Sequence, residues 1–291
     1  MNRSKHKLSV FTLLKHAVLL ASVICTLYPF IYMLAVSTSS SIYVLKGEVS
    51  IFPRGFNLGV YKFVLMDKNI FNAYLNTILY TITGTTISLS VTCAGAYALS
   101  KKRMIGSKFF SVMILFTMFF NGGLIPTYLT VRSLGLFDTM WAVIIPGAVS
   151  TWNFLIMRTF FRQFPVELEE SGKLDGLTDN GIFFRLVLPL STAVLATIGL
   201  FYAVGNWNSY FVPMIYLNDS KKFPLQLILR QIVLIGVNNN NNLVGASADS
   251  VAVDESIKYA TIIVSIVPII MVYPFIQRYF VKGVMVGSLK G

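Results

Sequence analysis

The residues that could do chemistry are concentrated in one short polar segment, residues 164–189. This segment reads FPVELEESGKLDGLTDNGIFFRLVLP and is the most charged part of an otherwise apolar chain. It lies between two hydrophobic stretches, and its Glu, Asp, Gly and Pro residues occur at a definite spacing. A function for the chain must therefore explain what an apolar protein does with one polar segment.

Sequence motifs for catalysis or metal binding are absent. The chain has no G-x-x-x-x-G-K-[ST] motif to hold nucleotide phosphates and no H-E-x-x-H motif. Its two cysteines, Cys25 and Cys93, lie in apolar runs, and its two histidines, His6 and His16, lie near the N-terminus, so neither a structural disulfide nor a zinc site is expected. We therefore expect no catalytic residue, no metal site and no cofactor on this chain.

The composition indicates an all-α polytopic membrane protein. Hydrophobic residues make up 55% of the 291 residues, charged residues 12%, and the mean hydropathy is +0.69. Soluble domains carry about 25% charged residues. The net charge of +12 is explained by Lys and Arg in loops between spans, and no basic face with interleaved aromatic residues indicates nucleic-acid binding.

The apolar runs predict one transmembrane domain over residues 1–291 with six helices, connected by polar segments. The second helix is rich in Ser and Thr, which favours close helix packing over a pore-lining face. A cytoplasmic elbow is expected at 161–185 and an outer loop at 218–257, in which Asn238 to Asn242 reads as a flexible insertion. The expected spans are 17–36, 72–99, 109–131, 138–160, 186–217 and 258–280.

The distribution of positive charge predicts the orientation. With six spans both termini lie on the same side, and that side receives 15 of the 24 Lys and Arg residues. Cytoplasmic loops carry the excess of these residues. We therefore expect the termini and the polar segment 164–189 in the cytoplasm. No Asp or Glu lies in the interior of an expected span, since Asp138 only begins the fourth, and this disfavours ion-coupled secondary carriers.

The polar segment predicts a helix–turn–helix elbow. Glutamates crowd the first turn of a short helix after Pro165, where they suit the helix dipole. Gly172 and Gly176 are expected to end or kink this helix, and a second helix is expected from about Ile182. The alternative is a solvated loop, but apolar residues between the charges favour docking into a groove on a partner protein. These apolar residues are Leu168, Leu174, Leu177 and Ile182.

The spacing within the elbow resembles a known family motif. Glu170-Ser171-Gly172 is followed by three residues and Gly176, and nine residues later the segment 186–189 reads Leu-Val-Leu-Pro. This is similar to the EAA loop of binding-protein-dependent ABC permeases, with Ser and Gly for the two alanines and Leu for Ile. Asp175, before the glycine, also matches a common form of the motif.

The resemblance extends over nearly the whole chain. Residues 121–161 and the tail Lys282 to Gly291 are similar to maltose-type (MalG-like) carbohydrate permeases, and most of all to the LplC- and YtcP-type oligosaccharide permeases. The resemblance implies the ABC type I importer permease fold in the plasma membrane. It also implies three protein partners: a second, non-identical permease subunit, an ABC ATPase dimer that binds ATP and Mg, and an extracytoplasmic sugar-binding lipoprotein. The implied substrate is an oligosaccharide. Membrane lipids are a further expected partner, and nucleic acid is not.

The resemblance also assigns roles to residues. Those implied to couple the elbow to the ATPase are Glu167, Glu169, Glu170, Ser171, Gly172, Leu174, Asp175, Gly176, Leu177, Leu188 and Pro189. Polar residues in or near interrupted spans are candidates for the sugar path, although packing between helices explains each of them equally well: Asn121, Asn153, Asn206, Trp207 and Asn208. A permease for another solute, or a secondary carrier, remains the alternative function.

Overall fold

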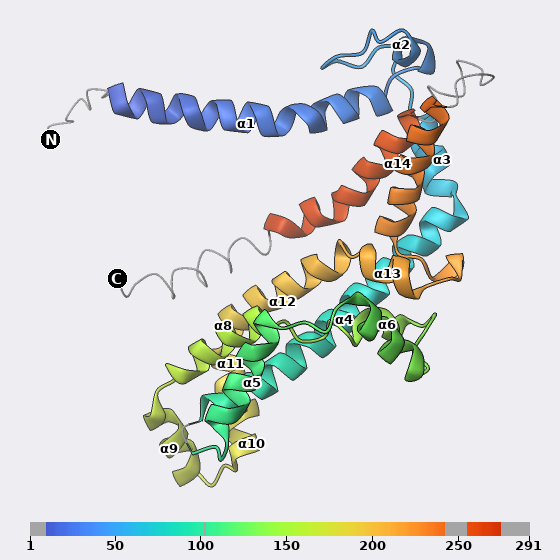
Figure 1. Cartoon of the computed structure of the whole chain (residues 1–291). Helices are drawn as coiled ribbons and strands as arrows, with labels where there is room; N and C mark the ends of the chain where they lie inside the picture. Colours follow the sequence, from blue (N-terminus) through green and yellow to red (C-terminus); the bar gives the residue numbers. More distant parts are fainter. Residues whose placement is uncertain (1–9, 102, 242–254, 275–291) are drawn as a thin grey trace, which may run out of the picture. The chain divides into compact units, whose positions relative to one another are not determined.

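The computed structural model describes residues 10–101, 103–241 and 255–274. These residues form helices and the segments that connect them, without any strand (Figure 1). This confirms the predicted all-α class. The helices are α1 (Val10–Ser37), α2 (Ser41–Leu45), α3 (Gly59–Met66), α4 (Lys68–Ser100), α5 (Ser107–Phe119), α6 (Leu124–Ser133), α7 (Met140–Ile144), α8 (Thr151–Arg162), α9 (Val166–Leu174), α10 (Asp179–Ile182), a π-helical turn (Phe183–Val187), α11 (Leu188–Leu190), α12 (Thr192–Trp207), α13 (Phe211–Tyr216), a 3₁₀ turn (Ser220–Lys222), α14 (Leu225–Asn241) and an unlabelled last helix, Glu255–Pro274.

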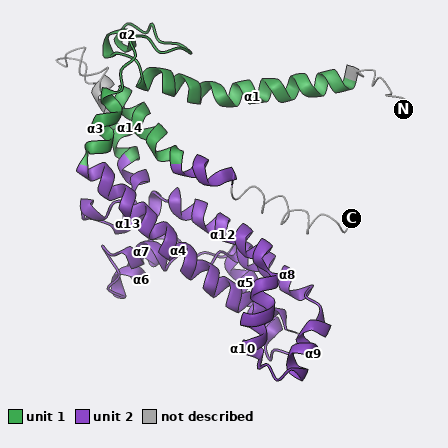
Figure 2. Cartoon of the chain, turned by 180° about the vertical axis from the view of Figure 1, so that it is seen from behind, with its two compact units in different colours: residues 1–67, 229–267 green, residues 68–228, 268–291 purple. Residues whose placement is uncertain are grey.

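The chain divides into two compact units, which are coloured separately in Figure 2. Unit 1 comprises residues 1–67 and 229–267, and unit 2 comprises residues 68–228 and 268–291. In unit 1, the C-terminal end of α1 is buried, and its residues Ala35 and Val36 form an apolar cluster with Val49. The Ser37 and Tyr61 hydroxyl groups share a hydrogen bond of 2.7 Å, which joins α1 to α3.

Unit 2 is built around α4, a helix of 33 residues that packs against both α8 and α12. Its buried positions include Thr77, Gly84, Ser88 and Thr92, which recur at helical spacing. A Cβ atom on Gly84 would lie 2.8 Å from Nδ2 of Asn206 on α12, so a larger residue would force the Asn206 side chain to shift. The Ser- and Thr-rich face of α4 therefore serves helix packing, as the sequence favoured.

One tyrosine hydroxyl joins the three central helices of unit 2. The Tyr202 hydroxyl on α12 lies 2.7 Å from Oγ1 of Thr92 on α4. It also accepts a hydrogen bond of 3.0 Å from the backbone N–H of Ser150, the residue that caps α8. Because Thr92 and Tyr202 are both buried, this contact satisfies polar groups that water does not reach.

The expected membrane spans are only partly continuous helices. Three helices are long and apolar enough to cross a membrane: Phe11–Ser37, Lys68–Ser100 and Glu255–Pro274. Two further spans are bent pairs, α5 with α6 at 117° and the segment Asp179–Leu190 with α12 at 81°. The described helices therefore provide three to five candidate spans rather than six regular ones.

The irregular spans contain the residues that interrupt a helix. The bend between α5 and α6 contains Gly123 at φ +86°, a conformation that glycine adopts readily, and Pro126 follows in α6. The expected span at 138–160 consists of the short helices α7 and α8, with a non-helical stretch between them that includes Pro146 and Gly147.

The structure of residues 218–257, the expected outer loop, also differs in part from what the sequence indicated. It holds α14 over residues 225–241, a helix that was not predicted from the sequence within this segment. Leu225, Leu227 and Leu229 are buried, and burial of these apolar side chains explains why a helix forms. Asn242, the residues after it up to 254 and the predicted tail motif at 282–291 lie outside the described residues.

Replacing Tyr202 with Phe should destabilise unit 2. The change removes one hydroxyl and leaves the Ser150 N–H and the Thr92 hydroxyl without their partner, so the expected loss is about 1–3 kcal/mol. Thermal unfolding of the purified chain in detergent measures this loss. Tyr128→Phe is the control, because Tyr128 makes ring contacts but no hydroxyl hydrogen bond among the described residues. Equal unfolding temperatures for the two variants would contradict the assignment.

Candidate functional site

The polar segment forms the helical elbow that the sequence predicts. Helix α9 begins after Pro165, with Glu167 and Glu169 in its first turn, and ends at Leu174. Gly176 follows at φ +79°, which reverses the chain direction. The Thr178 hydroxyl then caps α10 by accepting a hydrogen bond of 3.3 Å from the N–H of Gly181. Thr178 was missed, although Thr before Asp-Asn-Gly is a recognisable cap signal.

Gly172 does not end or kink α9, contrary to the sequence expectation. It is buried in the last turn of the helix, which continues past it to Leu174. A Cβ atom there would lie 2.9 Å from Cδ1 of Leu186 and 3.2 Å from Cγ1 of Ile182. The glycine is therefore needed for the close approach of α9 to the second half of the elbow.

The second half of the elbow leads into a membrane helix through an irregular helical path. Phe183–Val187 forms a π-helical turn, and Leu188 and Pro189 follow in α11. Proline has no backbone N–H and its ring crowds the preceding turn, which a wider π turn accommodates. The chain then bends at Ser191 and continues as α12. The expected span 186–217 therefore begins on the elbow side of this bend.

Helix α9 has two faces with different surroundings. Glu167, Glu170, Ser171 and Leu174 share one face and are all exposed, and the Leu174 residue is 89% exposed. Asp175, which ends the helix, is also exposed. An exposed leucine beside two carboxylates is an arrangement suited to docking on another protein.

The opposite face of α9 points toward the rest of unit 2. Glu169 forms an ion pair with Lys101, the first residue after α4, and the two side chains are only 20% and 29% exposed. Gly172 makes the close contact described above, and Leu177 and Leu188 pack against the main apolar core. The family resemblance implies that Glu169 couples the elbow to the ATPase together with Glu167 and Glu170, and in this structure its side chain pairs within its own chain. Lys101 was not identified from the sequence as a partner of the elbow, because the sequence indicated only its positive charge.

The residues expected to line a sugar path are not brought together into one site. Asn206 on α12 donates a hydrogen bond of 3.3 Å to Thr85 on α4, and Trp207 packs edge-on against Tyr74 at 6.2 Å between ring centroids. Asn208 caps α12 and donates to the carbonyl oxygen of Val204. These three residues join α12 to α4 or complete the end of α12.

The other two candidates lie elsewhere in unit 2. Asn121 lies in the break between α5 and α6, where its Oδ1 accepts a hydrogen bond of 2.9 Å from the N–H of Gly123. Asn153 is 7% exposed in the first turn of α8. Among the described residues, no hydrogen bond links either side chain to Asn206, Trp207 or Asn208.

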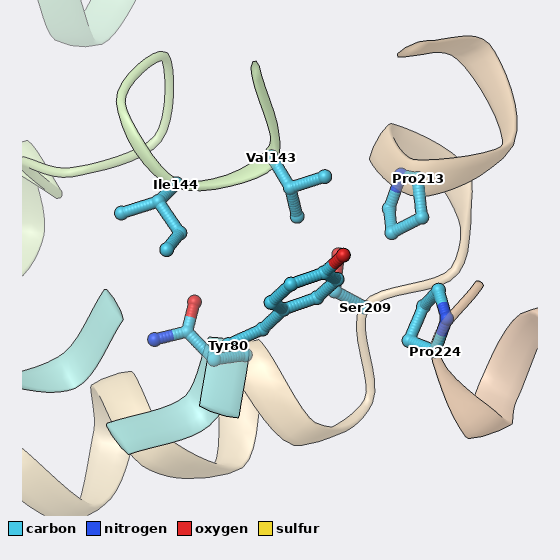
Figure 3. Close-up of a pocket in the computed structure, with 7 residues that line it drawn as sticks. Tyr80, Val143, Ile144, Ser209, Pro213 and Pro224 are labelled. Carbon is cyan, nitrogen blue, oxygen red and sulfur yellow. The ribbon is translucent and has the colours of Figure 1, made fainter. Parts of the chain in front are cut away.

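A small cavity lies beside Asn206, and Tyr80 reaches into it from α4 (Figure 3). The space open to a water-sized sphere is about 10 Å³, close to the room needed by one water molecule. This cavity is too small for a sugar ring. Its lining residues are Tyr80, Val143, Ile144, Asn206, Ser209, Pro213 and Pro224.

A polar cluster around Asp138 holds the loop 217–224 near the N-terminal part of α4. Asp138 accepts hydrogen bonds from the N–H groups of Asn218 and Asp219 and forms an ion pair of 2.8 Å with Lys222. The Tyr80 hydroxyl in turn donates to the carbonyl oxygen of Lys222. The hydrogen bonds that Asp138 itself accepts, above all that from Lys222 and then those from Asn218 and Asp219, lower its pKa from the usual 3.8 to about 2.

The helices, the bent pairs and the exposed elbow are those of a polytopic membrane protein with one polar helical segment. Residues 70–286 match the family described as binding-protein-dependent transport system inner membrane component, and the chain belongs to this family. It is therefore a transport subunit, a multi-pass permease of the plasma membrane.

Two curated relatives from Bacillus subtilis (strain 168) match almost end to end. The polygalacturonan/rhamnogalacturonan transport system permease protein YtcP is 40% identical, with 97% of this chain and 99% of that protein covered. Protein LplC is 42% identical, with 91% and 90% covered. These matches confirm the resemblance to LplC- and YtcP-type permeases.

A solved structure shows the same fold. A chain of a bacterial ABC transporter involved in the import of the acidic polysaccharide alginate is 35% identical, with a TM-score of 0.86. The match covers 96% of this chain and 100% of the other. This likeness supports the permease fold over nearly the whole length.

Protonating Asp138 should loosen the cluster with Lys222. Because the folded-state pKa is lowered, the stabilisation is fully present above the usual pKa of 3.8 and is lost as the pH falls toward about 2. The difference in unfolding temperature between the unaltered protein and Asp138→Asn should therefore be constant from about pH 7 to pH 5 and shrink below about pH 4.

Thermal unfolding in detergent at several pH values tests this prediction. Asp179→Asn is the control, because the Asp179 side chain is 86% exposed and its pair with Lys173 is long, at 3.5 Å. An Asp138→Asn difference that stays unchanged down to the lowest pH would show that the charge of Asp138 does not stabilise this loop.

Proposed function

We propose that this chain is one permease subunit of an ATP-driven importer that carries oligosaccharides into the cell. In this proposal the chain crosses the membrane six times with both termini in the cytoplasm. The elbow is cytoplasmic and receives the motion of a separate ATPase dimer, which binds and hydrolyses ATP with Mg. A second, non-identical permease subunit and an extracytoplasmic sugar-binding lipoprotein complete the assembly.

The observation that carries this proposal is the exposed face of α9. Glu167, Glu170 and Leu174 project from one side of a short helix that is packed on its other side. Leu174 is 89% exposed beside two carboxylates, and its burial in a partner groove would be favourable. The sequence has no motif for holding nucleotide phosphates, so the energy for transport must come from another chain.

The charges near the elbow support its cytoplasmic placement. Lys101, Arg158, Arg162 and Arg185 lie in the elbow or beside the helix ends next to it, and Nε of Arg158 donates to the carbonyl oxygen of Leu99 at the end of α4. Such charges near span ends favour the cytoplasmic side. The Asp138 cluster contacts the opposite part of α4, through Tyr80, and would face outward.

The small cavity beside Asn206 is not itself a sugar path. Its volume of about 10 Å³ admits about one water molecule, whereas a sugar ring needs a far larger path. In this proposal the second permease subunit supplies the other wall of the oligosaccharide path. Asn121, which is exposed in the break between α5 and α6, is the candidate residue for such a path.

The names of the relatives support the substrate class. One relative is named for polygalacturonan and rhamnogalacturonan, and the solved neighbour belongs to an importer of the acidic polysaccharide alginate. Oligosaccharides derived from acidic polysaccharides are therefore the first substrates to test. Uptake by the assembled importer of oligogalacturonides, alginate oligosaccharides and neutral maltotriose would separate acidic from neutral substrates.

Glu170→Arg should uncouple the importer. The change places a positive charge on the docking face, and breaking a buried charged contact at an interface weakens binding by roughly 30-fold or more. We expect the variant to insert normally but to lose co-purification with the ATPase and to lose sugar-stimulated ATP hydrolysis. Glu48→Arg is the matched control, since it makes the same charge change at an exposed pair in unit 1. Full coupling in Glu170→Arg would sink the assignment of the elbow.

A cysteine at Asn121 should report on the sugar path. In a Cys25→Ser background the remaining cysteine, Cys93, is buried and should not react. A water-soluble maleimide should then label Asn121→Cys in the assembled importer, and oligogalacturonides in transit should slow the labelling. Leu134→Cys, at an exposed position in the turn after α6, is the control. Labelling of Asn121→Cys that no tested oligosaccharide slows would count against a role in the path.

A further inference from the structure

The inward face of α9 is attached to unit 2 at two points that lead to different spans. Glu169 and Gly172 are three residues apart and therefore lie on the same side of the helix. Glu169 pairs with Lys101, which directly follows α4. Gly172 packs against Ile182 and Leu186, which lie on the path into α12. A displacement of α9 therefore acts on both α4 and α12.

The attachment to α4 is more than a surface ion pair. The Lys101 ammonium group lies 4.0 Å from the centroid of the Tyr97 ring, which favours a cation at that place. Tyr97 packs in turn against Phe161 at 5.7 Å and against Phe183 at 4.8 Å. Lys101 is thus fixed by its own helix before it meets Glu169, so less side-chain entropy is lost on pairing.

A second ion pair on α9 is far more exposed than the pair of Glu169 with Lys101. Lys173 and Asp179 are 3.5 Å apart, with side chains 50% and 86% exposed. Such a pair in water contributes little. It joins α9 only to α10, within the elbow.

We infer that Lys101 is a positioning residue for energy coupling: through Glu169 it ties α9 to α4, so that motion received at the elbow moves α4 together with α12. The inference rests on the proposed function for its role in transport. The inference assigns different roles to the glutamates of α9. Glu167 and Glu170 face outward for the ATPase, while Glu169 fixes the helix to its own chain.

Loss of the Lys101 charge would leave the rest of the elbow in place. Gly172 and Leu177 would still hold α9 against the path into α12. Glu169 would lose its partner at a site only 20% exposed, and α9 would no longer follow α4. Docking of the ATPase on the outward face would remain, but its motion would reach one span instead of two.

The test uses four variants of the full chain. Lys101→Met keeps an unbranched apolar stem over Tyr97 and removes the charge, and Glu169→Gln removes the charge of the partner. The double variant Lys101→Glu with Glu169→Lys restores a pair with reversed charges. Lys173→Met is the matched control, because it removes the exposed ion pair from the same helix.

The first measurement is hydrogen exchange of the α9 backbone in the purified chain. Lys101→Met should speed exchange in residues 166–174 by about tenfold, the charge-reversed pair should restore slow exchange, and Lys173→Met should have no effect. Unchanged exchange in Lys101→Met would overturn the inference. This measurement needs no partner, so it stands even if the proposed function fails.

The second measurement is coupling in the importer assembled in liposomes with its ATPase and binding protein, with Mg-ATP and oligogalacturonides as the probe. Lys101→Met should retain the ATPase but lower the sugar stimulation of ATP hydrolysis about fivefold, and the charge-reversed pair should recover it. Loss of the ATPase to the extent seen in Glu170→Arg would place Lys101 in docking and overturn its role in transmission. Absence of both ATPase binding and stimulation in the unaltered assembly would contradict the proposed function instead.

Discussion

The close packing of α4 against α8 and α12 is the constraint on which the rest of unit 2 depends. Lipid tails are as apolar as leucine, so helices in a membrane gain little from burying apolar side chains and rely on tight contact and hydrogen bonds. Gly84 and Thr92 on α4 supply both, the first by its missing side chain and the second through the Tyr202 hydroxyl. At one end α4 carries the Asp138 cluster, and at the other it meets the elbow.

The bends in the helices are the places where this packed unit departs from regular spans. A bend leaves backbone groups without partners, which is tolerated only where other parts of the protein or water satisfy them. At the α5–α6 bend the Asn121 side chain accepts from the N–H of Gly123, and at Ser191 the chain turns from the elbow into α12. The second bend matters for function, because it converts the direction of the elbow into the direction of a span.

Under the proposed function, the nine residues of α9 must meet two requirements. A docking helix must expose side chains to its partner, yet it must also be held firmly enough to pass on a displacement. The helical period of α9 separates these tasks, with Glu170 and Leu174 on the outward face and Glu169 and Gly172 on the inward face. Three glutamates of similar appearance in the sequence therefore have two different surroundings.

The sequence alone determined the all-helical class, the membrane location, the family and the position of the elbow. It could do so because apolar runs, Lys and Arg bias, and the Glu-Gly-Leu-Pro spacing are local properties of the chain. It did not determine that Gly172 would be a contact point, that residues 225–241 would be helical, or that Lys101 would pair with Glu169. Residues 101 and 169 are 68 positions apart, and the packing of α8 against α4 brings them together. Contacts of that range depend on how helices pack, and the tertiary structure alone decides them.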